Sequence, residues 1–88
     1  MSLHITADGT VGPVSVKGPC SIHFSGSFGG GTIAINRQTD GGDVALRDNG
    51  TAITVTSADD SFYEIGPCGL KFVMSGSTTP DVRIDIND

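Results

Sequence analysis

The segment Gly18-Pro19-Cys20-Ser21-Ile22-His23-Phe24 occurs a second time in the chain as Gly66-Pro67-Cys68-Gly69-Leu70-Lys71-Phe72. Each copy is a Gly-Pro turn followed by a cysteine and by apolar residues at alternate positions, and each continues into a Ser-Gly-Ser turn. Such alternation is typical of a β-strand with one buried face. We therefore expect two related β-hairpins that face or flank one another in a small all-β domain.

The same alternation continues on both sides of the two copies, and no stretch has the periodicity of a helix. Turn signals separate the apolar stretches, most clearly Asp40-Gly41-Gly42 and Asp48-Asn49-Gly50, which suit tight hairpins. Pro13 precedes Val14 and Val16, which indicates an edge strand because proline cannot donate to a sheet. The sequence predicts one domain over residues 1–88, a compact antiparallel β-sandwich or flattened barrel of about eight short strands, with either a jelly-roll-like or an immunoglobulin-like topology.

Length and charge restrict the possible partners of the chain. Its 88 residues provide a single small core, so oligomerisation would be a usual source of extra stability. The formal charge of −5, with only 5 Lys and Arg, argues against nucleic acid and against an anionic membrane surface. The start of the chain has neither a basic nor an apolar leader segment, so we expect synthesis in the cytosol without secretion.

The two cysteines stand at matched positions of the two copies, so we expect Cys20 and Cys68 to be neighbours in space. Three interpretations stay open for this possible thiol pair. The cysteines could be free thiols that are wholly or partly buried, a disulfide formed after release from the cell, or half of a metal site. Only 2 histidines are present, and neither stands at a ligand spacing from a cysteine.

Catalytic and metal-binding patterns are weak. His4 and His23 each lie on the polar side of an alternating stretch, and no G-x-S-x-G elbow presents a serine nucleophile near His23. Asp40 and Asp43 flank two glycines, but turn formation explains them without the many oxygen ligands that calcium needs. We expect no catalytic residues, no enzyme activity, no cofactor and no metal.

Two aromatic positions are candidate contact sites. Phe28 precedes Gly29-Gly30-Gly31, and its ring either packs back onto the fold or stands exposed as an anchor for a partner protein. Phe62 and Tyr63 are adjacent, so alternation places one of them in the core and the other outside. A carbohydrate site would require Tyr63 or Phe28 to be exposed beside polar groups that could bind sugar hydroxyls.

The middle and end of the chain resemble small β-sandwich proteins of tailed-bacteriophage virions. The resembling segments follow one another in a layout of strand, Asp-Gly turn, threonine-rich strand and final hairpin. They are Gly26-Ser27-Phe28-Gly29-Gly30-Gly31-Thr32-Ile33, Thr39-Asp40-Gly41-Gly42, Ile53-Thr54-Val55-Thr56, Leu70-Lys71-Phe72-Val73-Met74-Ser75-Gly76 and Val82-Arg83-Ile84. A tryptophan that often follows the Asp-Gly turn in such proteins is replaced here by Val44-Ala45-Leu46.

The resemblance implies a capsid decoration, or cement, protein on the outer surface of the virion, made in the host cytoplasm. Its partners would be the major capsid protein and two further copies of itself in a homotrimer. We expect the contacts to involve Leu3 and Ile5 of an N-terminal strand, together with Phe28 and Tyr63. The alternatives are a tail, neck or fibre component and a carbohydrate-binding or host-adhesion module.

Overall fold

The computed structural model describes residues 2–48 and 50–88, and within them the chain is all β, with no helix. Short turns separate strands that are mostly rich in alternating apolar residues, as the sequence predicts. The strands are β1 (Ser2–Ile5), β2 (Gly9–Val16), β3 (Cys20–Ser27), β4 (Thr32–Thr39), β5 (Gly42–Ala45), β6 (Arg47–Asp48), β7 (Thr51–Ala52), β8 (Thr54–Val55), β9 (Asp59–Tyr63), β10 (Cys68–Ser75) and β11 (Asp81–Asn87).

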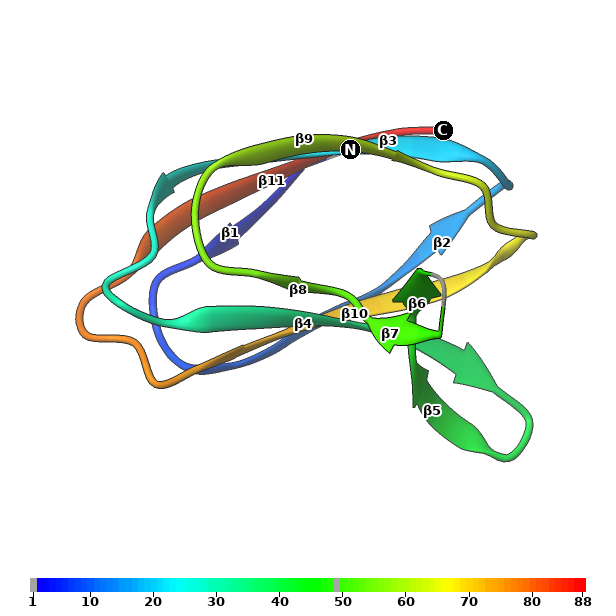
Figure 1. Ribbon diagram of the computed structural model, residues 1–88, viewed down its shortest axis with the longest axis horizontal. Coiled ribbons are helices and arrows are strands. Elements are labelled where there is room, and N and C mark those ends of the chain that lie inside the picture. The colour runs from blue at the N-terminus through cyan, green and yellow to red at the C-terminus, as the bar shows by residue number, and fades with distance from the viewer. Residues whose placement is uncertain (1, 49) are drawn as a thin grey trace.

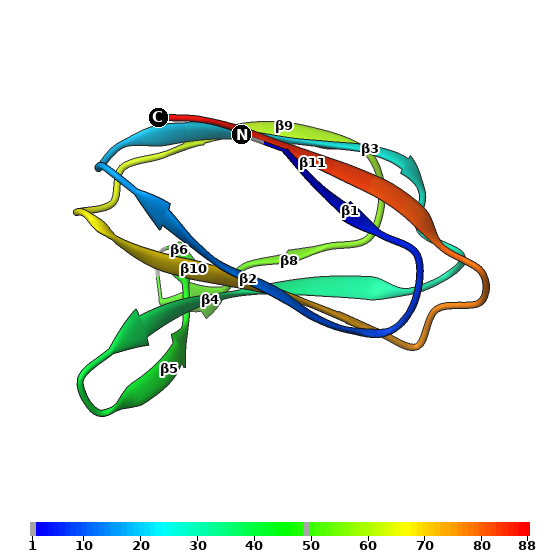
Figure 2. The same cartoon turned by 180° about the vertical axis from the view of Figure 1, so that it is seen from behind.

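Two antiparallel sheets contain nearly all of these strands and face each other (Figure 1). Sheet A has the order β1-β11-β3-β9. Sheet B has the order β2-β10-β4, and the far edge of β4 pairs first with β8 and then with β5. The short strands β6 and β7 form a separate hairpin. The β4–β5 hairpin projects beyond the two sheets, as both views show (Figures 1 and 2).

The core lies between the sheets and consists of their inward-facing residues. In β11, for example, Val82, Ile84 and Ile86 are buried and the residues between them are exposed. Phe24 of sheet A and Phe72 of sheet B meet at the centre, edge to face, with ring centroids 6.1 Å apart. The predicted arrangement of two antiparallel sheets around one core is therefore confirmed.

The predicted pair of hairpins is wrong. After the first copy of the repeat, β3 in sheet A leads into β4 in sheet B; after the second, β10 in sheet B leads into β11 in sheet A. Neither strand pairs with its successor, because each Ser-Gly-Ser segment begins a connection that crosses between the sheets. Alternation identifies a strand and its buried face, but it carries no information on which strand lies beside it.

The chain consists of two similar halves that exchange strands. We call β1–β4 the first half and β8–β11 the second half; each places two strands in each sheet. Replacing every strand of sheet A by its counterpart gives β8-β4-β10-β2, which is the order found in sheet B. The registers agree as well, because Phe24 lies opposite Ile84 and Phe72 lies opposite Ile35. Strands β5–β7 are an insertion between the halves.

Corresponding connections of the two halves meet at both ends of the molecule. At one end the Gly-Pro connections are adjacent, since a Cβ on Gly18 would lie 3.7 Å from the carbonyl oxygen of Ile65. At the other end the amide of Thr78 donates to the carbonyl of Gly29 at 2.9 Å. Gly29 has a φ of +60°, and a Cβ there would lie 2.2 Å from the Thr78 carbonyl oxygen, so the close approach requires glycine.

The turn predictions have different outcomes. Asp40-Gly41 connects β4 to β5 as expected, and Thr39 Oγ1 donates to the Gly42 carbonyl at 2.6 Å. Strands β6 and β7 pair on either side of the predicted Asn-Gly turn, of which Asn49 itself lies outside the described residues. Strand β2, which contains Pro13, is an edge strand with a bulge opposite Leu70–Phe72, as the proline indicates.

Candidate functional site

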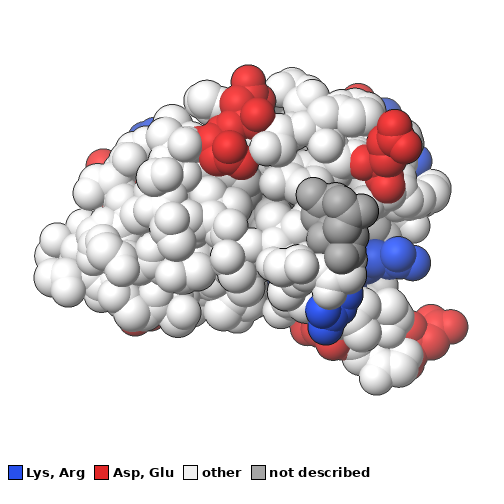
Figure 3. Space-filling view, viewed as in Figure 1, with Lys and Arg blue, Asp and Glu red and all other residues white. Residues whose placement is uncertain are grey.

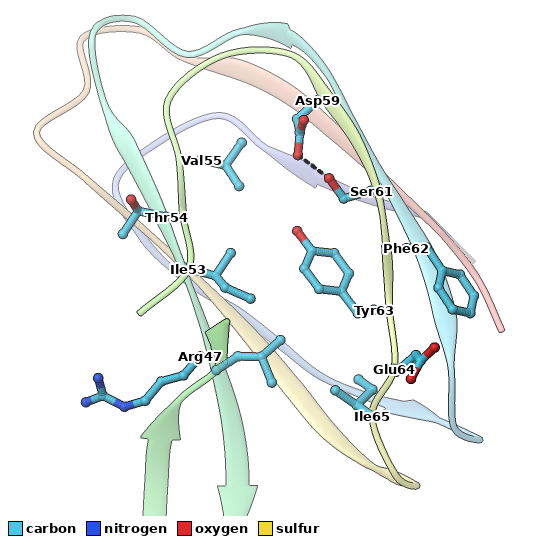
Figure 4. Close-up of a pocket in the computed structure, with 11 residues that line it drawn as sticks. Arg47, Ile53, Thr54, Val55, Asp59, Ser61, Phe62, Tyr63, Glu64 and Ile65 are labelled. Atoms are coloured by element: carbon cyan, nitrogen blue, oxygen red, sulfur yellow. Dashed lines mark hydrogen bonds between the residues drawn. The ribbon is translucent and has the colours of Figure 1, made fainter. Parts of the chain in front are cut away.

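A groove opens along one side of the molecule, between the β9 edge of sheet A and the β8 edge of sheet B. It has a volume of about 690 Å³, and Figure 4 shows the side chains around it. Its lining comes from β9 and the residues that follow it, from β8, and from the base of the β6–β7 hairpin. The lining residues are Leu46, Arg47, Ile53, Thr54, Val55, Asp59, Ser61, Phe62, Tyr63, Glu64 and Ile65.

The groove combines an apolar wall with a polar one. Ile53 and Val55 contribute the apolar wall on the β8 side, and both belong to or pack against the core. Inward-facing residues of β9 form the opposite wall, where Ser61 Oγ donates to Asp59 Oδ2 at 2.8 Å. The half-buried ring of Tyr63 points into the groove between the two walls (Figure 4).

Charge around the groove is mixed, with a small acidic excess. Asp59 and Glu64 contribute two carboxylates on the sheet A side, and Arg47 contributes one guanidinium. The Arg47 guanidinium donates to the carbonyl of Gly50 at 3.0 Å, which holds it at the β6–β7 hairpin. Figure 3 shows acidic side chains over β9, and both basic and acidic ones at the β4–β5 hairpin.

The sequence prediction missed most of this site. Ser57-Ala58-Asp59-Asp60 looks like a polar break, yet Asp59 and Asp60 begin β9. The inward positions of that strand hold polar residues, so they lack the apolar alternation by which a strand is recognised. Alternation did predict correctly that Phe62 and Tyr63 lie on opposite faces, and Phe62 is the outer one, 62% exposed.

The predicted contact residues lie in different environments. Ile5 is 2% exposed and belongs to the core, and Leu3 is half-buried against it. Phe28 is 6% exposed, so its ring packs onto the fold and the exposed-anchor interpretation is wrong. The ring is buried because Gly29 closes the connection against Thr78 directly after it. Only Tyr63 lies at the groove, and the exposed neighbour Phe62 was not among the predicted contacts.

Both cysteines are free thiols at the end where the Gly-Pro connections meet. Cys20 is buried and Cys68 is half-buried. Desolvation raises the pKa of the Cys20 thiol, and the nearby charges of Asp88 and Cys68 raise it further. The structure places both cysteines near this end of the molecule as free thiols, and the three interpretations of the pair stay predictions.

Neither histidine is placed beside a nucleophile. His23 lies on the outer face of β3, 4.0 Å from an Asp60 oxygen, whereas Cys20 points into the core on the opposite face. His4 bonds to Asp81 at 2.5 Å, which lowers the pKa of that aspartate. At the hairpin tip Asp43 accepts a hydrogen bond from Lys71 at 3.0 Å. Across residues 2–48 and 50–88, no three His, Cys, Asp or Glu side chains are grouped so that they could hold a metal ion.

Comparison with protein-family models, with curated proteins and with solved structures finds no match for this chain. Within the described residues there is no helix that could cross a membrane.

Proposed function

We propose that the two sheets form a jelly roll and that the chain is a structural virion protein that decorates a tailed-phage capsid. The strand order supports the first part. If β1–β4 and β8–β11 are counted as strands 1 to 8, the sheets have the orders 1-8-3-6 and 2-7-4-5. Jelly rolls of two four-stranded sheets are common in viral capsid and lectin domains. This part of the argument is an analogy of fold.

One surface observation carries the functional proposal. Phe62 on β9 and Val44 on β5 are the large apolar side chains left exposed, at 62% and 49%, among the described residues. Both lie on strands at the edge of a sheet, Phe62 in sheet A and Val44 in sheet B. An exposed aromatic ring beside an unpaired strand edge suits a protein partner, which can bury the ring and add a strand to the sheet.

The partner on this proposal is the major capsid protein, with the chain bound outside the shell as a homotrimer. The acidic surface would keep many copies soluble before they bind. Phe62 and Val44 replace Ile5 and Phe28 as the expected contacts, because core residues are not available to a partner. A trimer would also compensate for the small core of an 88-residue chain.

Co-sedimentation of the purified chain with phage heads that lack it tests this proposal. We expect binding by the natural sequence and its loss in Phe62→Ser and Val44→Thr, while Ser15→Ala on the exposed face of β2 binds normally. Light scattering should give three times the 9.0 kDa mass, in solution or on the shell. Binding to isolated tails instead would favour the tail, neck or fibre alternative, and binding to neither would contradict both.

A further inference from the structure

The two halves of the fold differ in the residues on the inner face of one edge strand, which is β2 in the first half and β9 in the second. Strands β2 and β9 are counterparts, and each lies beside the cysteine-bearing strand of the other half. In β2, Val16, Val14 and Val11 lie opposite Cys68, Leu70 and Phe72. In β9, the corresponding partners of Cys20, Ile22 and Phe24 are Tyr63, Ser61 and Asp59. Three valines in one half thus correspond to a tyrosine, a serine and an aspartate in the other.

Stability alone does not account for this difference. The valines of β2 close their edge of the core, with Val14 and Val16 buried. Polar residues at the same positions bury less apolar surface and are less stabilising. In the second half these residues instead face the groove of about 690 Å³. A polar substitution at an edge that lines a groove indicates that the groove receives a ligand.

We propose that this groove binds a neutral saccharide. The Ser61 hydroxyl donates a hydrogen bond to the Asp59 carboxylate at 2.8 Å, so the free lone pairs of both groups stand side by side as acceptors for neighbouring sugar hydroxyls. The Tyr63 ring and the apolar wall of Ile53 and Val55 are apolar surfaces against which the C–H groups of a pyranose ring can pack. A few polar groups set over apolar walls are the usual composition of a ligand site.

The charges favour a neutral ligand over an anionic one. Asp59 and Glu64 oppose phosphate, sulfate and carboxylate groups, and the one cation of the lining, Arg47, already bonds to the Gly50 carbonyl. Phe62 belongs to the lining, but its ring points away from the interior of the groove in Figure 4. The saccharide proposal rests on Asp59, Ser61 and Tyr63 and does not require the proposed capsid contact.

Two-dimensional ¹H–¹⁵N NMR titration of the whole chain tests the proposal. The probes are glucose, galactose, mannose and N-acetylglucosamine with their β-linked dimers, then sialic acid as an anion and a lysine-rich peptide as a cation. We expect at least one neutral sugar to shift the amides of β8 and β9 at millimolar concentration. Failure of every neutral sugar, or shifts in the groove caused only by the anion or the peptide, would overturn the proposal.

The similarity of the two halves suggests which substitutions test the groove. Ser61→Val and Asp59→Val introduce the residue that the first half has at each position, so both should give well-dispersed spectra of a folded protein. Each should weaken sugar binding by about tenfold or more, because each removes a hydrogen-bonding group from the groove. Ser25→Val, on the outer face of β3, is the matched control and should bind normally. Unchanged affinity in both groove variants would also contradict the assignment.

Discussion

Phe24 and Phe72 occupy the same position in the two copies of the repeat and meet each other in the centre of the core. Their rings contact edge to face at 72°, with centroids 6.1 Å apart, and neither is accessible to solvent. Each is also the register partner of an isoleucine from the other half, Ile84 for Phe24 and Ile35 for Phe72. The duplicated segment is therefore the place where the two halves hold each other.

Phe24→Leu and Phe72→Leu should each lower the free energy of unfolding by about 1–3 kcal/mol, the usual range for a change in a packed core. Because the rings contact each other, the double variant should lose less than the sum of the single losses, by about 0.5–1.5 kcal/mol. Denaturant titration of the four proteins of the cycle measures this coupling. Strict additivity would show that the edge-to-face contact contributes nothing of its own.

Phe28 and Phe62 should behave in opposite ways when changed to serine. The buried Phe28 ring lies in the core, so Phe28→Ser should destabilise the fold by about 3–5 kcal/mol. Phe62→Ser, at an exposed position, should alter stability by no more than about 0.5 kcal/mol. Thermal and urea unfolding distinguish the two. A stable Phe28→Ser protein would show that the ring contributes little to the core.

Gly29 and Gly30 form a matched pair for testing the contact between the two crossing connections. Both have positive φ, +60° and +77°, so alanine at either position should cost about 1–2 kcal/mol of backbone strain. Gly29→Ala also places a Cβ against the Thr78 carbonyl, whereas nothing lies within 4 Å of a Cβ on Gly30. We expect Gly29→Ala to be clearly the less stable. Equal losses would mean that the connection moves aside easily.

Asp8 should make the fold sensitive to acid. Hydrogen bonds from the hydroxyl and the amide of Ser77 hold the pKa of Asp8 below its ordinary value of 3.8, and the amide bond is 3.0 Å long. A lowered pKa in the folded state means that the carboxylate stabilises the fold above pH 3.8 and that this contribution disappears as the pH falls through the lowered value. Asp81, whose pKa is lowered by His4, acts in the same direction.

Asp8→Asn should therefore show a smaller loss of stability on acidification than the natural chain. Urea midpoints measured from neutral pH to below 3.8 provide the comparison. Asp40→Asn, in the β4–β5 turn, serves as the control for removal of one carboxylate. A natural chain and an Asp8→Asn variant with parallel pH profiles would exclude a role for the Asp8–Ser77 contact.

Sequence patterns predicted where the strands of this protein lie better than they predicted which strands pair with each other. Alternation identified the buried faces around Ile22, Leu70 and Ile84, since burial acts on each side chain separately. Pairing depends on where a connection leads, and no residue of Ser25-Gly26-Ser27 specifies whether the chain turns back or crosses to the other sheet. The crossing became visible only in the three-dimensional structure.

The candidate site could not be predicted for a related reason. Asp59 and Ser61 are polar residues on the inward side of a strand, and in a sequence such residues resemble a loop. They stand out only by comparison with Val11 and Val14, which occupy the corresponding positions of the other half. That correspondence requires the register of both edge strands, which the sequence does not contain. Tyr63 was recognisable as a candidate because aromatic residues are few in this chain.

The position of β11 has a consequence for how the protein is made. This strand, Asp81–Asn87, lies between β1 and β3, so sheet A lacks an inner member until those residues have left the ribosome. Strand β4 likewise cannot pair with β10 until that strand has been synthesised, much later in translation. Contacts between residues so distant along the chain slow folding, because the closure of long loops precedes any gain from pairing. We expect this domain to remain unfolded until Asp81–Asn87 have left the ribosome.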